Sequence, residues 1–253
     1  MDRQTRWVLV TGASTGIGRA VTEYLVGHGF GVYAGVRKTE DMVALEKVSS
    51  IVPLRLDVQH DADVQAALDL VTRSGTGLFA IVNNAGIAKA GPIMDVPVAD
   101  MIEQFDVNVI GVHRVTKAFL PLVIANKGRI VMISSDSGFF ATPFFGPYCA
   151  SKFAVEGYAD SLRREVGMLG VRVTIIEPGR IATPIWNKGK ASLSIETTSP
   201  LLPLAKKVGQ HAIDRGNAKG LPPVEVAKAV HHALVAKKPK LRHIVASNKG
   251  EYM

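Results

Sequence analysis

Residues 7 to 18 read Trp-Val-Leu-Val-Thr-Gly-Ala-Ser-Thr-Gly-Ile-Gly, and this stretch decides the fold. Trp7 to Thr11 is a short apolar run of the kind that forms a buried strand. The glycine-rich turn that follows leads directly into apolar residues at helical spacing: Ile17, Val21, Tyr24 and Leu25. Strand, turn and helix in this order predict a pyrophosphate site, because the glycines let a phosphate approach the free N–H groups at the helix N-terminus.

The alternation of strand and helix continues along the chain. Further strands are predicted at Gly31 to Val36, Val52 to Leu56, Leu78 to Val82, Gly128 to Ser134, Val171 to Glu177 and His243 to Ala246. Helices are predicted at residues 39–45, 61–71, 98–124, 147–167 and 224–236, and the segment from about 180 to 223 is predicted to be irregular. Nearly continuous apolar strands between helices indicate a mostly parallel sheet covered on both faces. We predict one doubly wound, Rossmann-type α/β domain over residues 1–253, with a substrate-binding loop at about 183–223.

Composition narrows the class of protein. The single cysteine, Cys149, excludes an internal disulfide framework and a cysteine-rich metal site, and no metal is expected. The formal charge is +8, but the basic residues are scattered and not interleaved with aromatic residues, so we expect no nucleic-acid partner. Apolar stretches such as 118–125 are far shorter than the ~20 residues of a spanning helix, and no signal peptide is evident. We expect no transmembrane segment and a cytoplasmic location.

Four polar or turn-forming motifs fall where predicted strands end. They are Asp57-Val58, Asn83-Asn84-Ala85-Gly86, Ser134-Ser135 and Pro178-Gly179. Each alone is explained by local structure, as a helix cap, a turn or a local hydrogen bond. Because parallel strands present their carboxyl ends at one edge, where this architecture binds ligands, the four together predict a site at that edge.

Residues 148 to 152 read Tyr-Cys-Ala-Ser-Lys and predict an acid/base pair. A tyrosine and a lysine four residues apart lie on one face of a helix. A phenol has a pKa near ~10, and a neighbouring ammonium favours its ionised form. Such a pair can form a proton donor that works near neutral pH.

In these motifs the sequence resembles the short-chain dehydrogenase/reductase family, over nearly the whole chain. The resemblance implies that Tyr148 is the acid/base, that Lys152 lowers its pKa and holds the nicotinamide ribose, and that Ser135 binds the substrate oxygen. It also implies that Asn108 holds a water linking Lys152 to solvent. The cofactor residues expected from it are Gly12, Ser14, Thr15, Gly16, Ile17, Gly18, Arg37, Lys38, Asp57, Val58, Asn84, Gly86, Tyr148, Lys152, Pro178, Gly179, Ile181 and Thr183.

The cofactor choice depends on the end of the second strand. An acid there would bind the ribose hydroxyls of NAD, but Val36 takes that position and Arg37 and Lys38 follow it. A guanidinium suits a 2′-phosphate, so we predict NADP(H). The alternative is that these basic residues form only a solvated turn.

The substrate is less constrained. Between Ser135 and Tyr148 lie four phenylalanines, and the predicted substrate contacts are Ser135, Phe140, Phe144, Phe145 and Trp186. Lining a pocket, these rings would select a bulky apolar ketone, aldehyde or alcohol, such as a steroid or retinoid; alternatively they pack beneath a loop. The resemblance is strongest to the hydroxysteroid and retinol dehydrogenase branch. A reductase of 3-oxoacyl thioesters and a non-catalytic NADP-binding protein are alternatives, and the family resemblance suggests a homo-dimer or homo-tetramer.

Overall fold

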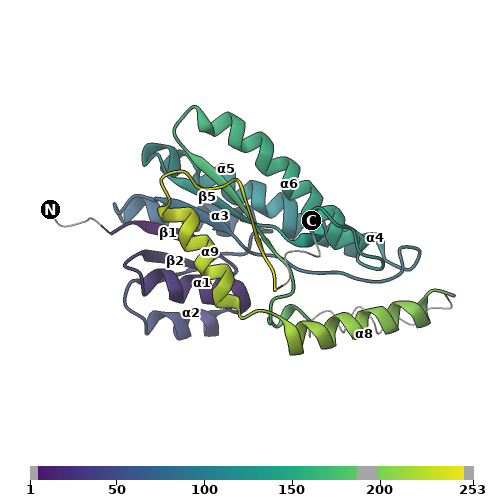
Figure 1. Ribbon diagram of the computed structural model, residues 1–253. Coiled ribbons are helices and arrows are strands. Elements are labelled where there is room, and N and C mark those ends of the chain that lie inside the picture. The colour runs from purple at the N-terminus through teal and green to yellow at the C-terminus, as the bar shows by residue number, and fades with distance from the viewer. Residues whose placement is uncertain (1–4, 187–198, 248–253) are drawn as a thin grey trace.

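The computed structural model describes residues 5–186 and 199–247, which contain a seven-stranded sheet (Figure 1). Every neighbouring pair is parallel, and the order across the sheet is β3-β2-β1-β4-β5-β6-β7. The strands are β1 (Trp7–Thr11), β2 (Gly31–Val36), β3 (Ile51–Arg55), β4 (Ala80–Asn83), β5 (Arg129–Ile133), β6 (Arg172–Pro178) and β7 (Arg242–Val245). The predicted doubly wound parallel architecture is confirmed.

Helices cover both faces of the sheet (Figure 1). The helices are α1 (Gly16–Val26), α2 (Thr39–Glu46), α3 (Asp61–Arg73), α4 (Val98–Phe105), α5 (Gly111–Ala125), α6 (Gly146–Gly167), α8 (Leu202–Lys219) and α9 (Pro223–Val235). Buried side chains of α1, α2 and α9 form a core on one face, and those of α3, α5 and α6 form a second core on the other. The layers follow from the sequence, since a parallel sheet must bury both of its apolar faces.

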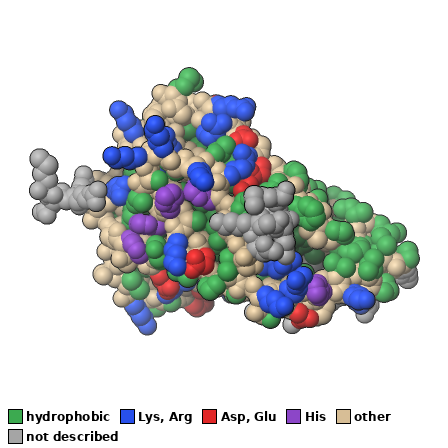
Figure 2. All heavy atoms as spheres, viewed as in Figure 1, with side chains coloured by type: hydrophobic (Ala, Val, Ile, Leu, Met, Phe, Trp, Pro, Cys, Tyr) green, Lys and Arg blue, Asp and Glu red, His purple; other side chains and the backbone are tan. Residues whose placement is uncertain are grey.

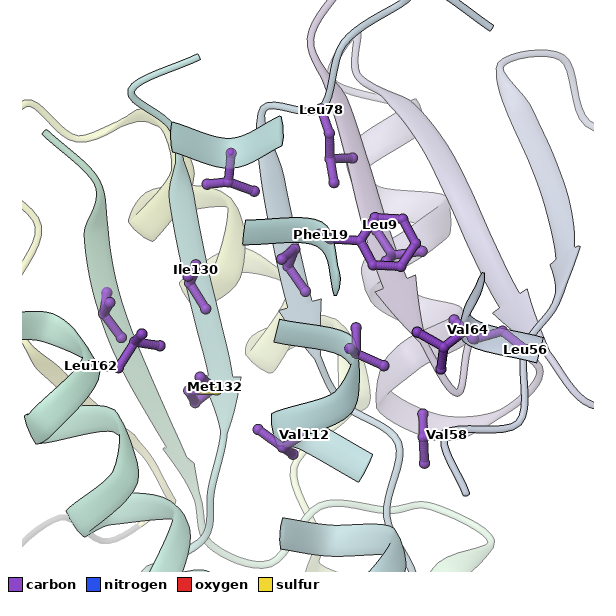
Figure 3. Close-up of a cluster of buried hydrophobic side chains, with 14 of the residues drawn as sticks. Leu9, Leu56, Val58, Val64, Leu78, Val112, Phe119, Ile130, Met132 and Leu162 are labelled. Atoms are coloured by element: carbon purple, nitrogen blue, oxygen red, sulfur yellow. The ribbon is translucent and has the colours of Figure 1, made fainter. Parts of the chain in front are cut away.

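The core under α3, α5 and α6 shows how the sheet is anchored (Figure 3). Phe119 of α5 lies over Leu9 of β1, and Met132 of β5 lies near Val112, all within one cluster of buried side chains. Full burial of one such side chain contributes about 1.5–3 kcal/mol. The strands whose ends form the site are therefore held in place by the packed apolar layer between the sheet and helices α3, α5 and α6.

One continuous helical stretch, Val98–Ala125, is apolar and long enough to cross a membrane by composition. In the structure it comprises α4, a π-helical turn at Asp106–Ile110, and α5. Val115, Phe119 and Val123 of this stretch are fully buried against the sheet. The stretch is therefore a core helix of the fold.

The segment after β6 differs from the prediction. Residues 202–219, expected to be irregular, form helix α8, which extends away from the sheet (Figure 1). Its helical pattern is weak because Pro203, Gly209 and Gly216 interrupt it and few of its apolar residues recur on one face. Residues 187–198 of the predicted loop lie outside the described part of the chain.

The strand order places the site. Going outward from β1, the chain first adds β2 and β3 on one side and then β4, β5 and β6 on the other. This reversal makes a topological switch point between β1 and β4, and ligands of such sheets bind beyond the carboxyl ends of the strands there. The predicted motifs at the ends of β1, β4, β5 and β6 all lie along this edge.

Candidate active site

The turn between β1 and α1 requires glycine at particular positions. Gly12 and Gly16 have φ values of 65° and 57°, in the left-handed region that favours glycine. A β-carbon on Gly18 would lie 2.2 Å from the Gly12 carbonyl oxygen and 2.5 Å from Asn84 Nδ2. The turn is thus closely packed, and it leaves the N-terminus of α1 open to an anionic group, with no acidic residue in its first turn.

Thr11 and Asn84 hold this turn against the end of β4. The Thr11 hydroxyl accepts hydrogen bonds from the backbone N–H groups of Asn84 and Ala85, both at 2.9 Å. Asn84 Nδ2 donates to the Thr11 carbonyl oxygen at 2.8 Å and to that of Gly12 at 3.2 Å. Asn84, predicted as a cofactor contact, therefore uses its amide to brace the turn.

Asn108 lies in the π-helical turn between α4 and α5, a type of distortion that is frequent at functional sites. Its Oδ1 accepts from the Ile87 backbone N–H at 2.9 Å, and its Nδ2 donates to the Ile87 carbonyl oxygen at 3.0 Å. The same Nδ2 donates to Ser151 Oγ of α6 at 3.1 Å. Asn108 joins the segment after β4 to the helix that carries Tyr148; its predicted water-holding role stays a prediction.

Ser135 is the second residue after the end of β5 and is buried. Its hydroxyl donates to Asp136 Oδ1 at 2.8 Å and accepts from the Ser137 backbone N–H at 3.1 Å. The Ser135 side chain also interacts with the Tyr148 phenol and lowers its pKa. Two hydroxyl groups, one from the segment after β5 and one from α6, therefore lie close together; their catalytic roles stay predictions.

Lys152 lies one turn after Tyr148 on α6 and is 6% exposed. Its Nζ donates to the Ile133 carbonyl oxygen at 2.8 Å and lies 5.6 Å from the centre of the Tyr148 ring. Burial lowers the pKa of Lys152 to about 8, and the charge of Glu156 opposes that shift. Ser135, Tyr148 and Lys152 are thus brought together by the end of β5 and the first turns of α6.

The expected lowering of the Tyr148 pKa is not found in the structure. Burial raises the pKa of the Tyr148 phenol well above its usual value, the hydrogen bond to Ser135 opposes this, and the charge of Asp136 raises it further. The physical reason is the burial of the phenol, which the Lys152 ammonium, bound to the Ile133 carbonyl oxygen, does not offset. The protonated phenol is therefore strongly favoured in the arrangement of these side chains alone.

The other predicted cofactor residues border the same edge. Arg37 and Lys38 are exposed immediately after β2. Val58 is buried against Gly111, while the Asp57 carboxylate accepts from the Gln59 backbone N–H at 3.1 Å. The remaining ones also lie at this edge: Ser14 and Thr15 belong to the turn after β1, Ile17 to the start of α1, Gly86 follows β4, Pro178 ends β6 and Gly179 follows it.

Ile181 and Thr183 continue this border from the segment after β6. A β-carbon on Gly16 would lie 3.3 Å from Thr183, so this segment packs over the glycine-rich turn. Ile181 is buried and pairs with Leu221 in an isolated parallel bridge. Both residues therefore close the turn from above, although the side chain of Ile181 points into the core.

The predicted substrate residues divide into two groups. The Phe145 ring packs on the Tyr148 ring with centroids 4.6 Å apart, and Phe140 is 63% exposed. Phe144 has a φ of 64°, and its carbonyl oxygen accepts from the Gly91 backbone N–H at 2.8 Å. Of these phenylalanines, Phe145 lies beside Tyr148.

Trp186 lies elsewhere. Its Nε1 donates to the Ile181 carbonyl oxygen at 2.6 Å, and its ring packs on α8 so closely that a β-carbon on Gly216 would lie 2.4 Å from it. Trp186 thus packs between the segment after β6 and α8, and its contact with the substrate stays a prediction.

Several functional groups were missed by sequence reasoning. Thr11 was not singled out, although a hydroxyl at the end of β1 is a usable signal. Asp136, which accepts from Ser135, and the Ile133 carbonyl, which holds Lys152, were missed too. A backbone carbonyl leaves no trace in the sequence, so only the structure reveals the second.

The fold and the site together define a dinucleotide-dependent oxidoreductase with a serine–tyrosine–lysine centre. A family model described as short chain dehydrogenase matches residues 6–193. The chain belongs to the short-chain dehydrogenase/reductase family.

Similar proteins support this assignment. The chain is 38% identical over 253 residues to an NADPH-dependent 3-dehydrocapnine reductase of Ornithobacterium rhinotracheale, covering 96% of this chain and 89% of that protein. It is 34% identical to the mitochondrial D-beta-hydroxybutyrate dehydrogenase of Rattus norvegicus, covering 93% of this chain and 75% of that protein. A solved short-chain dehydrogenase of Streptomyces avermitilis is 28% identical, with a TM-score of 0.87, covering 100% of this chain and 92% of that chain.

Proposed function

We propose that this protein is an NADP(H)-dependent oxidoreductase that interconverts a ketone or aldehyde and an alcohol on a bulky apolar small molecule. The observation that carries the proposal is the meeting of the Ser135 and Tyr148 hydroxyls beside the buried Lys152. When bound, the cofactor supplies or accepts a hydride. The protein then orients the substrate oxygen between the two hydroxyls and moves one proton to or from the Tyr148 phenol.

In the reduction direction, Ser135 and Tyr148 donate hydrogen bonds to the substrate oxygen as negative charge develops on it, and Tyr148 delivers the proton. The raised pKa of Tyr148 keeps its proton in place at neutral pH. In the oxidation direction, the phenolate is needed, so turnover should increase with pH. A cation near a phenol favours the phenolate, and Lys152 Nζ lies 5.6 Å from the centre of the Tyr148 ring.

The residues at the edge of the sheet fit NADP(H). The glycine-rich turn cannot accept a β-carbon at Gly18 and exposes the N-terminus of α1, which would hold the pyrophosphate. Arg37 and Lys38 are exposed at the end of β2, where they would hold the 2′-phosphate. The name of the similar NADPH-dependent reductase supports the same choice.

Apolar side chains at the same end of the molecule support a bulky apolar substrate. Ile93 is 71% exposed, and its Cδ1 lies 3.2 Å from the point where a β-carbon on Gly146, two residues before Tyr148, would lie. Figure 2 shows hydrophobic side chains gathered at the end where α4 lies in Figure 1. Steroids and retinoids present the extended apolar surface that such side chains bind.

The test is a screen of NADPH oxidation with matched carbonyl substrates. We expect turnover of a ketosteroid or of retinal at a kcat/KM at least about tenfold above that of acetoacetyl thioesters, a difference of about 1.4 kcal/mol in transition-state binding. A preference for the thioester would replace the proposal with the acyl-reductase alternative. Absence of turnover of every carbonyl, with NADPH bound, would favour the non-catalytic alternative.

We further propose that copies of the chain associate through α4, α5 and α6, as a homo-dimer or homo-tetramer in the cytoplasm. Ile110, at the end of the π-helical turn, and Phe153 of α6 are large apolar residues that lie exposed on these helices. Light scattering after size-exclusion chromatography should give a multiple of the 27.1 kDa chain. Phe153→Lys should shift the protein toward the monomer, and a monomeric unchanged protein would contradict the proposal.

A further inference from the structure

A group of charged side chains lies beyond Lys152 on α6. Glu156 Oε2 accepts from Arg242 Nε of β7 at 2.9 Å, and Asp160 Oδ2 accepts from Arg242 Nη2 at 2.9 Å. Glu177 Oε1, near the end of β6, lies 3.5 Å from the same Nε. Three carboxylates therefore share one guanidinium, and that guanidinium fixes their positions across α6, β6 and β7.

Glu156 is the member of this group that reaches the catalytic centre. It follows Lys152 by four residues, so the two side chains lie on one face of α6, and Glu156 is only 9% exposed. If Gly138 carried a β-carbon, that atom would be 3.2 Å from Glu156 Oε1 and 2.7 Å from Ser134 Oγ. The carboxylate thus extends to the end of β5, where Lys152 Nζ binds the Ile133 carbonyl.

The second oxygen of Glu156 is available to act on Lys152. Oε2 is taken by Arg242, whereas Oε1 is buried and has no hydrogen-bond partner within residues 5–186 and 199–247. The negative charge of a buried carboxylate oxygen without a partner interacts strongly with nearby charged groups, because little solvent screens it. Lys152 is the cation one helical turn away, and Glu156 raises its pKa against the effect of burial.

Among the groups around this cluster, Glu156 is the one that stabilises the charge of Lys152, as its neighbours on the other elements show. Burial and the charge of Glu156 raise the pKa of Glu177 to about 7, with Arg242 opposing, so Glu177 carries only part of a charge near neutral pH. Near Glu156 also lie Gly138, at the end of the 3-10 turn Asp136–Gly138, and the hydroxyl of Ser134, which follows β5. The next residue of β7, His243, points to the other side, where its ring lies 5.6 Å from that of His232.

We propose that Glu156 is a positioning residue that keeps Lys152 protonated in its buried place, with Arg242 holding the Glu156 carboxylate in position. The inference rests on the proposed function for its effect on turnover, but the protonation of Lys152 is measurable without a substrate. Loss of the Glu156 charge should lower the pKa of Lys152. Lys152 would then lose its proton at a lower pH, and above that pH Tyr148 would be a weaker proton donor.

The test compares Glu156→Gln with two other variants. In E156Q the pH at which the rate of ketone reduction falls on the alkaline side should be lower by roughly one unit. The reason is that an opposite charge nearby shifts a pKa by about 1–3 units. The ¹³Cε resonance of Lys152, assigned by its absence in K152R, should titrate at a correspondingly lower pH. Glu156→Asp keeps the charge but withdraws it by one methylene, so its shift should be smaller and in the same direction.

Asp160→Asn is the matched control, because it removes a carboxylate from the same Arg242 and the same helix but lies two turns from Lys152. It should lower the melting temperature about as much as E156Q and leave the titration of Lys152 unchanged. An unchanged Lys152 titration in E156Q, or an equal shift in D160N, overturns the proposal.

Two other outcomes also decide. If E156Q does not fold, E156D takes its place, and an unchanged Lys152 titration in E156D overturns the proposal. If the unchanged protein turns over no carbonyl while the Lys152 titration shifts in E156Q, the proposed function fails and the role of Glu156 in holding the Lys152 charge stands.

Discussion

The turn after β1 and the hydroxyl centre after β5 lie on the same edge of the sheet but are built in different ways. At the turn, Gly12, Gly16 and Gly18 are required by shape, and the Asn84 amide ties the backbone together. At the centre, buried groups with shifted pKa values, Tyr148 and Lys152, depend on the charges around them. One region is fixed by sterics and the other by electrostatics, so substitutions should act on them differently.

The largest effect should come from steric disruption of the turn. Gly18→Ala places a β-carbon 2.2 Å from the Gly12 carbonyl oxygen, and backbone must move to accept it. Overpacking of this kind costs about 1–3 kcal/mol or more. We expect the melting temperature to fall by roughly 3–10 °C and NADPH affinity, measured by fluorescence titration, to fall at least about tenfold.

The matched control for that change is Gly167→Ala, at the end of α6, where a β-carbon would meet nothing within 4 Å. Alanine in a helix is favoured over glycine, so this variant should be as stable as the unchanged protein or slightly more so. A G18A protein with unchanged melting temperature and NADPH affinity would show that the turn is not fixed by close packing.

Cofactor choice should respond to charge at the end of β2. Arg37→Asp replaces a guanidinium that suits a 2′-phosphate with a carboxylate that repels it. A charge-assisted hydrogen bond contributes about 1.5–3 kcal/mol, so the ratio of kcat/KM for NADPH over NADH should fall by roughly 10–100-fold. Lys38→Ala should reduce the ratio less, and an unchanged ratio in R37D would contradict the NADP(H) assignment.

A smaller effect should follow from removing the charge of Asp136, which raises the pKa of Tyr148. Oxidation of the alcohol needs the Tyr148 phenolate, so its rate rises with pH through that pKa. In Asp136→Asn the pKa falls, and the rise should move to lower pH by up to about one unit. Asp69→Asn, an exposed carboxylate on α3, is the control, and a rise that stays in place in D136N would argue against electrostatic control.

The smallest effect should lie outside both regions, on the face covered by α1 and α9, where Figure 2 shows histidines gathered. The His28 and His231 rings lie 4.6 Å apart, and burial, His28, Arg6 and His232 lower the pKa of His231. Because the unfolded chain then binds more protons, this contribution to stability is present above the unfolded pKa, near ~6.5, and is lost as pH falls through it.

His231→Gln should therefore lose less stability between pH 7 and pH 5 than the unchanged protein, in thermal unfolding at each pH. His211→Gln, an exposed histidine of α8, is the control. Ketone reduction at pH 7.5 should be unaffected in both variants. A decline in H231Q as steep as in the unchanged protein would contradict the assignment.

The sequence predicted the steric region better than the electrostatic one. The glycines, the strand ends and the parallel, doubly wound sheet follow from local patterns in the sequence. The pairing of Ser135 with Asp136, the attachment of Lys152 to the Ile133 carbonyl and the direction of the Tyr148 pKa depend on burial and on groups distant in the chain.

Helix α8 shows the same limit at the level of the fold. Its sequence has a proline, two glycines and few regularly spaced apolar residues, so local propensity favoured a loop. In the structure, Gly216 makes room for the Trp186 ring, and Ala205 and Ile213 are buried. Tertiary packing thus stabilises a helix that the pattern of residues did not indicate, and the Trp186 ring packs against that helix.

The central claim is that Tyr148 delivers the proton while the glycine-rich turn holds the cofactor independently of it. The most direct test measures NADPH affinity and ketone reduction side by side in Tyr148→Phe, with the best substrate from the screen. The account predicts a fall in kcat of at least about 10²–10⁴-fold with NADPH affinity unchanged within about threefold. Turnover near that of the unchanged protein would contradict it.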